Sequence, residues 1–338
     1  MFSVSTPCSS NNLFIKFSFI SLFLFFFLRF NVKAYNKRAN TKVLTNSIFL
    51  KHIISPNHPE KPDRISYILN NLKKSKNSSL LENIDTKRNV QKWIKEIHTN
   101  THVNSLRKLY PLAEKVSRYA VKVCLTGVDK IMKKESKNIF CAVRPPGHHA
   151  LNTGKDEGFC YYNHIAITAK YIQKKFKLKK ILIVDWDYHH GNSTEYFFYD
   201  DPSVLFFSTH DQFAYPGTGS PQRKGAGKGL GFNINIHLPC KTKDKDMIKV
   251  YDQVLVPNVH KFKPDFILIS AGFDSRINDT LGCFNLSDDC FRKLTKMLIK
   301  LSKLYCDSRI LSILEGGYNL DGNAKATLAH IDELNNLN

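Results

Sequence analysis

Short apolar runs alternate with amphipathic stretches along most of the chain. The runs at 139–143, 181–184, 204–208, 265–270 and 309–314 have the length and the β-branched content of strands buried in a parallel sheet. Helical periodicity is found at 116–132, 166–175 and 246–260, and a final helix is expected after Tyr318, ending at about 334. Residues 232–238 alternate between apolar and polar side chains, which predicts a half-buried strand. This alternation of strands and helices predicts an α/β fold with a parallel sheet.

The run at 181–184 passes directly into Asp185-Trp-Asp-Tyr-His-His-Gly-Asn192. Asp185, Asp187 and His189 alternate at period two, so an extended backbone places their side chains on one side. Ligands of open α/β sheets bind at the carboxyl ends of the strands, and Zn²⁺ is the common metal for mixed nitrogen and oxygen ligands. A single Asp here would more often cap a loop, but the whole pattern favours a metal site.

Three other predicted strands also end in polar residues. His148 and His149 follow the first run, Asp274 follows the run at 265–270, and Tyr318 follows the last. One site at the sheet edge would collect all of them. Asp187, His189 and Asp274 would then be three ligands with one open position, as in catalytic metal centres. With a histidine as proton acceptor and a tyrosine as oxyanion donor, this predicts metal-dependent amide hydrolysis.

Composition limits the classes of protein and the kinds of site that the chain can contain. The 338 residues are 42% hydrophobic and carry a net charge of +21, which fits a globular protein, taken here as one large catalytic domain. Lysine outnumbers arginine 39 to 11 without an Arg-rich stripe, so no direct nucleic-acid binding is predicted. The glycines at 225–231 lack the spacing of a phosphate-binding loop. Eight scattered cysteines without a Cys-x-x-Cys pair predict neither a structural zinc site nor a disulfide framework.

Residues 1–51 differ from the remainder, and the catalytic domain is expected at 52–338. The apolar run at 17–28 matches the core of a signal peptide and is short for a membrane span. No acidic residue precedes Glu60, and acid-poor basic segments are typical of transit peptides. A two-part leader is therefore expected, directing the protein through the secretory route to a plastid-like organelle. Secretion and membrane anchoring are the alternatives, and membrane contact is expected only through this leader, if it is retained.

Six ordered motifs resemble the zinc-dependent histone deacetylase superfamily, especially its class II-like branch. They are Arg-Pro-Pro-Gly-His-His-Ala, Gly-Phe-Cys, Val-Asp-Trp-Asp-x-His-His-Gly-Asn, Tyr-Pro-Gly-Thr-Gly, Ala-Gly-Phe-Asp and Glu-Gly-Gly-Tyr-Asn-Leu, and the similarity runs from about His52 to Leu334. The resemblance implies a three-layer, arginase-like α/β fold with a central, mostly parallel sheet of roughly eight strands flanked by helices. It also implies one Zn²⁺ per chain and removal of acetyl groups from protein lysine side chains or from related amines.

Roles follow from the resemblance, residue by residue. The implied zinc ligands are Asp187, His189 and Asp274, and the implied catalytic residues are His148, His149, Tyr318, Asp185 and Asn192, with His149 as general base and Asn192 as its partner. Gly158, Phe159, Tyr215 and Leu281 fall where the family lines its narrow acyl-lysine tunnel. Asp185 and Ser208 match a structural K⁺ site of the family.

One departure from the family pattern bears on the substrate. The family has an Asp in a loop that binds the backbone of a peptide substrate. In the matching region of this chain, residues 109–116, the only acidic residue is Glu114. Acetylated protein lysine and a small acetylated amine such as an acetylpolyamine therefore both stay open as substrates. A non-catalytic acyl-lysine binder is disfavoured by the intact Tyr318 and ligand set. An arginase-like centre with two Mn²⁺ ions would need more bridging carboxylates.

Overall fold

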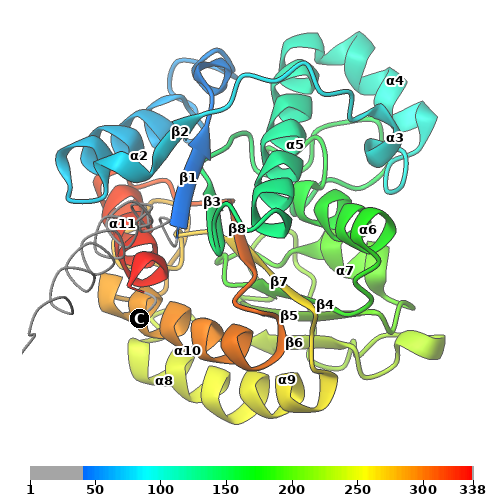
Figure 1. Ribbon diagram of the computed structural model, residues 1–338, viewed down its shortest axis with the longest axis vertical. Coiled ribbons are helices and arrows are strands. Elements are labelled where there is room, and N and C mark those ends of the chain that lie inside the picture. Colours follow the sequence, from blue (N-terminus) through cyan, green and yellow to red (C-terminus); the bar gives the residue numbers. More distant parts are fainter. Residues whose placement is uncertain (1–40, 337–338) are drawn as a thin grey trace, which may run out of the picture. The chain divides into compact units, whose positions relative to one another are not determined.

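The computed structural model describes residues 41–336. Its centre is an eight-stranded sheet in the order β2-β1-β3-β8-β7-β4-β5-β6, and every neighbouring pair of strands is parallel (Figure 1). The strands are β1 (Thr41–Thr45), β2 (Leu81–Asn83), β3 (Asn138–Cys141), β4 (Ile181–Asp185), β5 (Val204–His210), β6 (Asn233–His237), β7 (Phe266–Ala271) and β8 (Ile310–Leu314). The parallel α/β sheet expected from the alternating pattern is confirmed.

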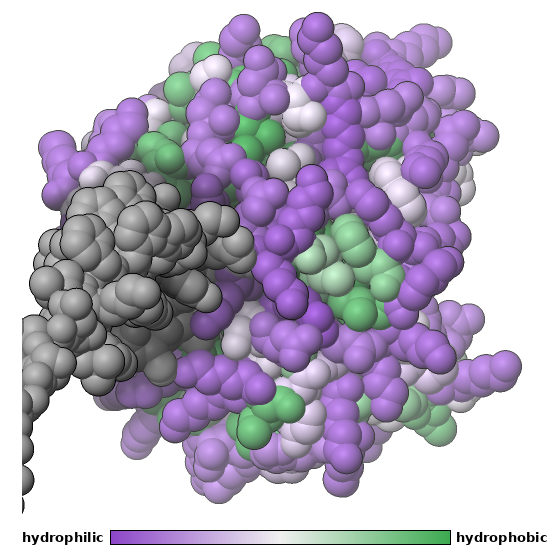
Figure 2. Space-filling model, in the orientation of Figure 1, coloured by the Kyte–Doolittle hydropathy of each residue, from purple (hydrophilic) through white to green (hydrophobic). Residues whose placement is uncertain are grey.

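Helices cover both faces of this sheet (Figure 1). One layer contains α5 (Pro111–Met132) and α6 (His164–Phe176), which pack on each other, with α3 (Gln91–Ile94), α4 (Asn100–Leu109) and α7 (Asn192–Phe198) beside them. The other contains α2 (Asp63–Lys74), α10 (Asp288–Tyr305) and α11 (Leu320–Asn335), with α8 (Asp244–Val250) and α9 (Val256–Phe262). Hydrophilic side chains dominate the face seen in Figure 2, as expected where amphipathic helices turn their polar sides outward.

The central strands explain where the site forms. All residues of β4, β7 and β8 are buried, which their apolar sequences allow because helices cover both faces. In register, Asp185 lies opposite Ser208 of β5 and opposite Ser270 of β7. Parallel strands in this register end at the same edge, so the segments after β4, β7 and β8 emerge next to one another.

The domain boundary and one helix differ from the sequence predictions. Strand β1 lies between β2 and β3, so the expected boundary at residue 51 is too late, and the folded domain includes residues from Thr41 onward. A five-residue strand with threonine at both ends is too short and too polar to stand out in the sequence. The predicted helix at 246–260 is interrupted by a π-helical turn, Tyr251–Leu255, between α8 and α9. Residues 1–40 of the predicted leader lie outside the described residues.

Cys240 and Cys283 form a disulfide across 43 sequence positions, a pair that the scattered cysteine pattern did not suggest. The free cysteines of the described chain are buried, namely Cys124, Cys141, Cys160, Cys290 and Cys306. The bridge ties the segment after β6 to the segment that follows Asp274. No helix within residues 41–336 is long and apolar enough to cross a membrane.

Candidate active site

The three predicted metal ligands converge at the carboxyl edge of the sheet. Asp187 and His189 follow β4 and Asp274 follows β7, and their ligand atoms all lie within 4.8 Å of one another. His189 Nδ1 lies 3.0 Å from Asp274 Oδ2 and 3.2 Å from Asp187 Oδ1. Both carboxylates are buried, and the His189 side chain is only 13% exposed. Oxygen and nitrogen donors in this arrangement fit a divalent cation such as Zn²⁺.

The electrostatics of this cluster also favour a cation. Burial, reinforced by the neighbouring Asp187 carboxylate, raises the pKa of Asp274 above its ordinary value. Burial alone would lower the pKa of His189, but hydrogen bonds to Asp187 and Asp274 raise it to about 10. Two buried carboxylates that share one imidazole therefore form a locally anionic cluster, and a divalent ion would neutralise it.

Backbone amides hold the two carboxylates in place. Gly316 N donates to Asp187 Oδ2 at 2.8 Å, and Tyr188 N donates to Asp274 Oδ1 at 2.9 Å. Position 316 must be glycine at this distance, because a Cβ atom would lie 2.2 Å from Asp274 Oδ2 and 2.7 Å from Asp187 Oδ2. The loop after β8 therefore approaches the predicted metal ligands through its backbone.

The adjacent histidines have different partners. His148 Nδ1 lies 3.0 Å from Asp185 Oδ2, whereas His149 Nδ1 lies 2.7 Å from the amide oxygen of Asn192, and the two ring centroids are 4.0 Å apart. Burial alone would lower the pKa of His148, but the carboxylates of Asp187 and Asp185 raise it to about 10. Burial, together with the neighbouring imidazole of His148, holds the pKa of His149 well below its ordinary value. Two neighbouring imidazoles with opposite shifts are suited to opposite proton-transfer roles.

Glu315, a residue without an assigned role in the sequence analysis, positions the histidine pair. Its Oε2 accepts hydrogen bonds from Gly147 N at 2.6 Å and from His148 N at 3.2 Å. Burial raises the pKa of Glu315 to about 7. A glutamate at the buried end of an apolar strand was the available signal, because such a carboxylate requires partners.

Tyr318 is buried beside the same edge. Burial raises the pKa of Tyr318 well above its ordinary value, so the hydroxyl keeps its proton. The guanidinium of Arg64 lies 4.8 Å from the centroid of its ring, and Arg64 Nε donates to Gly317 O at 2.7 Å. The tyrosine is therefore packed against a buried cation and can act as a hydrogen-bond donor.

A buried ion cluster supports the loops on this side, and no pattern in the sequence indicated it. Glu60 bridges two arginines, with Oε2 at 2.6 Å from Arg144 Nη2 and Oε1 at 3.2 Å from Arg64 Nη1. All three side chains are fully buried. Arg144 follows β3 and leads into the histidine loop, while Arg64 holds the loop of Tyr318. Glu60 therefore links the arginine that precedes the histidine loop to the arginine that holds the loop of Tyr318.

Three of the predicted tunnel residues, Gly158, Phe159 and Tyr215, lie close to His149 or Tyr318. Gly158 has φ +52°, and a Cβ atom there would lie 2.3 Å from His149 Cδ2. The ring of Tyr215 stands nearly perpendicular to that of His149 at 5.0 Å, and the ring of Phe159 lies 6.0 Å from that of Tyr318. Tyr215 is 50% exposed and Leu281 is 40% exposed, which places both at the surface.

Ser208 lies opposite Asp185 across the β4–β5 pair, and both are buried. The Ser208 hydroxyl is 2.8 Å from His210 Nδ1, and Asp185 Oδ1 accepts from Asp187 N at 3.1 Å. The two residues expected at a K⁺ site are thus neighbours, and the K⁺ site stays a prediction.

The region that should carry the substrate-gripping Asp contains no loop. Helices α4 and α5 are separated by Tyr110 alone. Glu114 is buried in α5, where it accepts from Tyr162 OH at 2.9 Å and pairs with Arg118 at 3.0 Å. Its carboxylate is therefore occupied within the domain and is not turned to a substrate.

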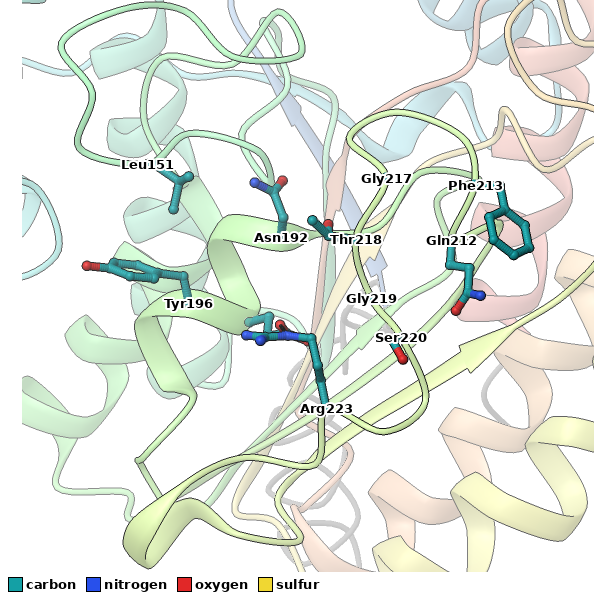
Figure 3. A pocket seen from close by; sticks show the side chains of 11 residues that line it. Leu151, Asn192, Tyr196, Gln212, Phe213, Gly217, Thr218, Gly219, Ser220 and Arg223 are labelled. Atoms are coloured by element: carbon teal, nitrogen blue, oxygen red, sulfur yellow. Dashed lines mark hydrogen bonds and ion pairs between the residues drawn. The ribbon is translucent and has the colours of Figure 1, made fainter.

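A separate cavity of about 480 Å³ lies next to Asn192 (Figure 3). It is lined by Leu151, Asn192, Glu195, Tyr196, Gln212, Phe213, Gly217, Thr218, Gly219, Ser220 and Arg223. None of these residues is a predicted metal ligand or tunnel residue, so this cavity adjoins the histidine site without being the expected tunnel.

Known proteins share this architecture. Residues 58–334 match the family described as Histone deacetylase domain. A relative named Probable deacetylase from Archaeoglobus fulgidus is 35% identical over 300 residues, covering 83% of this chain and 82% of the relative. Histone deacetylase 14, chloroplastic, from Arabidopsis thaliana is 33% identical over 295 residues, which cover 78% of this chain and 70% of the relative. The solved structure of the HDA15 HD domain superposes with a TM-score of 0.81 at 32% identity, covering 88% of each chain.

Proposed function

Because the chain belongs to the histone deacetylase family and is therefore a hydrolase of amide bonds, we propose that it removes acetyl groups from lysine side chains of proteins with the help of one zinc ion. The observation that carries this proposal is the convergence of Asp187, His189 and Asp274 beside two histidines with different partners. A cation held there would supply Lewis acidity to the acetamide carbonyl and to water.

The residues around that position have complementary roles. The amide oxygen of Asn192 accepts the Nδ1 proton of His149, which leaves Nε2 free to take a proton from water and return it to the leaving amine. The carboxylate of Asp185 favours the cationic form of His148. The hydroxyl of Tyr318 donates a hydrogen bond to the developing oxyanion. Together these groups hold and move protons on the two sides of one acetamide.

The rim supports an extended, neutral substrate chain. Phe159 and Tyr215 provide aromatic surfaces next to Tyr318 and His149, and such walls suit the methylenes of an acetylated lysine. Gly158 brings its backbone close to His149 where any side chain would collide.

A second substrate class is favoured by one observation. The direct α4–α5 junction and the internal pairing of Glu114 leave that region without the carboxylate that would hold a peptide backbone. A small acetylated amine, such as an acetylpolyamine, would not need such a contact. Acetylated protein lysine is the leading assignment because the family is described as Histone deacetylase domain and the relative from Arabidopsis thaliana is named a histone deacetylase.

The decisive experiment compares acetyl-lysine peptides with acetylpolyamines, each with and without a chelator. We expect turnover of the peptides, its loss with chelator, and its recovery with added Zn²⁺. Preferential turnover of acetylpolyamines would move the assignment to the second class. Persistence of full activity in metal-free protein would overturn the zinc proposal.

A matched pair of variants tests the tyrosine. Tyr318→Phe should lower kcat by about 100-fold or more, because one oxyanion donor contributes on that scale. Tyr67→Phe, which changes a 43% exposed tyrosine of α2, should leave kcat unaltered. Metal content should stay the same in both. An inactive wild-type protein with acetyl-lysine bound would instead point to a binding module.

We also propose delivery to a plastid-like organelle, on the basis of the expected leader and of relatives named chloroplastic in Arabidopsis thaliana and Oryza sativa. A fusion of residues 1–60 to a fluorescent reporter should enter that compartment. Cytosolic fluorescence would contradict the proposal, and secretion or membrane retention would identify one of the two alternatives.

A further inference from the structure

The carboxylate of Asp279 joins two segments of the site that are far apart in sequence. Its Oδ1 accepts hydrogen bonds from Leu281 N at 2.9 Å and Gly282 N at 3.1 Å. Its Oδ2 accepts from Tyr318 N at 2.7 Å and Asn319 N at 3.0 Å. One side chain therefore accepts from four backbone amides. Two belong to the segment 279–283, called the rim segment below, and two belong to the loop that carries Tyr318.

The contacts of Oδ1 alone would be an ordinary local turn, in which Asp accepts from amides two and three residues later. The contacts of Oδ2 have no such local explanation, because they reach residues 39 and 40 positions away. A second cross-link runs in parallel, from Asn319 Nδ2 to Asn278 O at 2.9 Å. The two segments are thus connected by side chains from both sides.

The backbone before Tyr318 needs this support. Gly317 has φ +120°, and Gly316 precedes it, so the chain approaches the tyrosine through two residues that restrict it least. Asn319 then begins the cap of α11 by accepting from Gly322 N. Asp279 holds the amides of Tyr318 and Asn319, which lie between the permissive glycines and the rigid helix.

The other end of the rim segment contacts a predicted metal ligand. A Cβ atom on Gly282 would lie 1.9 Å from the backbone oxygen of Asp274, so the two backbones are in close contact. Cys283 is bonded to Cys240. The segment from Asp279 to Cys283 is therefore held in place next to Asp274. Because Asp279 binds the backbone of Tyr318, this segment also determines where Tyr318 lies.

We infer that Asp279 is a positioning residue that sets the distance between the Tyr318 hydroxyl and the predicted metal ligands. It does so by holding the amide of Tyr318 and the amide of Leu281 on the same carboxylate. The inference rests on the proposed role of Tyr318. Its physical basis is that an oxyanion donor is effective only at hydrogen-bond distance, and a displacement of about 1 Å can cost about 100-fold in rate.

Asp279→Asn is the primary test, since it keeps the size and the Oδ1 acceptor. The amide nitrogen that replaces Oδ2 would face the N–H groups of Tyr318 and Asn319 and could not accept from them. We expect kcat to fall by about 10- to 100-fold, with KM and zinc content little changed. Asp289→Asn makes the same charge change at an exposed residue in the first turn of α10, which pairs with Lys293, and should behave as wild type.

The effect of Asp279→Asn in a Tyr318→Phe background distinguishes positioning from general damage. If Asp279 acts through the hydroxyl, the residual activity of Tyr318→Phe should be nearly unaffected by the second change. The same fold loss in both backgrounds would overturn the inference. Full activity of Asp279→Asn, with Tyr318→Phe inactive, would overturn the inference alone, whereas an active Tyr318→Phe would overturn the proposed role of the tyrosine and the inference with it.

A conservative variant covers the case in which Asp279→Asn does not fold. Asp279→Glu keeps the charge and both acceptor oxygens but places them farther from the backbone. We expect a folded protein with normal zinc content and a lowered kcat. Wild-type kcat in Asp279→Glu would show that the tyrosine does not depend on the carboxylate at this distance, and would overturn the inference.

Discussion

The Nδ1 atom of His149 lies 2.7 Å from the amide oxygen of Asn192. An amide orients the imidazole without adding charge, while the neighbouring His148 is oriented by the carboxylate of Asp185. A histidine that must accept a proton benefits from this neutral partner, because a nearby carboxylate would stabilise the protonated form.

Replacement of Asn192 by Asp should therefore move the pH dependence of catalysis. The added carboxylate raises the pKa of His149, so the neutral, proton-accepting form appears only at higher pH. We expect the acidic limb of kcat/KM against pH to move upward by at least about one pH unit. Asn70→Asp, the same change on an exposed residue of α2, should leave the limb in place. An unmoved limb in the Asn192→Asp variant would contradict the role of His149.

Gly316 should be essential for metal binding rather than for folding. A methyl group at this position would collide with the carboxylates of Asp187 and Asp274. We expect Gly316→Ala to lose most of its bound zinc, as measured by elemental analysis, and its activity with it. Gly231→Ala is the control, since Gly231 has φ +89° and open space around its Cβ position. Alanine at a positive φ should cost roughly 1–2 kcal/mol of stability, but the variant should retain zinc. Full occupancy in Gly316→Ala would show that the ligands can move aside.

The parts of the site that sequence could predict are those that follow strands. Asp187, Asp274 and Tyr318 each stand just after an apolar run, and parallel strands bring such positions to one edge. Glu315 also follows an apolar strand, but the sequence could not show that its carboxylate accepts from the amides of the histidine loop. Asp279 has no comparable signal, because its role depends on backbone amides of a segment that only the folded chain places beside it. Strand β1 was missed for a related reason: its position between β2 and β3, more than its five residues, makes it a strand.

Loss of the charge on Glu60 should destabilise the whole domain. The carboxylate is the shared anionic partner of two fully buried guanidinium groups. Glu60→Gln leaves the positive charge of the two buried guanidinium groups uncompensated. The free energy of unfolding, measured by urea denaturation, should therefore fall by about 3–5 kcal/mol. Asp63→Asn, in the same region, removes an exposed carboxylate 3.9 Å from Lys61 and should change stability by less than about 1 kcal/mol. Equal effects of the two variants would rule out a special role of the buried cluster.

Glu195 should make folding sensitive to acid. It lies in α7 and lines the cavity beside Asn192, and its carboxylate is buried. Burial alone would raise the pKa of Glu195, but His190, Asn235 and Arg223 lower it from 4.5 to about 2. Since the folded-state pKa is depressed, the carboxylate contributes stability above pH 4.5, and that contribution disappears as the pH falls toward 2.

The comparison of wild type with Glu195→Gln isolates this contribution, because other acid-sensitive groups are common to both proteins. Above about pH 5 the wild type should be more stable by up to about 3 kcal/mol, and the gap should close by about 1.4 kcal/mol per pH unit below pH 4.5. Urea unfolding between pH 3 and 7 measures it. Glu135→Gln, at a 44% exposed side chain, should show no such gap. A gap for Glu195→Gln that stays constant with pH would mean that the glutamate contributes through packing and neutral hydrogen bonds, and not through its charge.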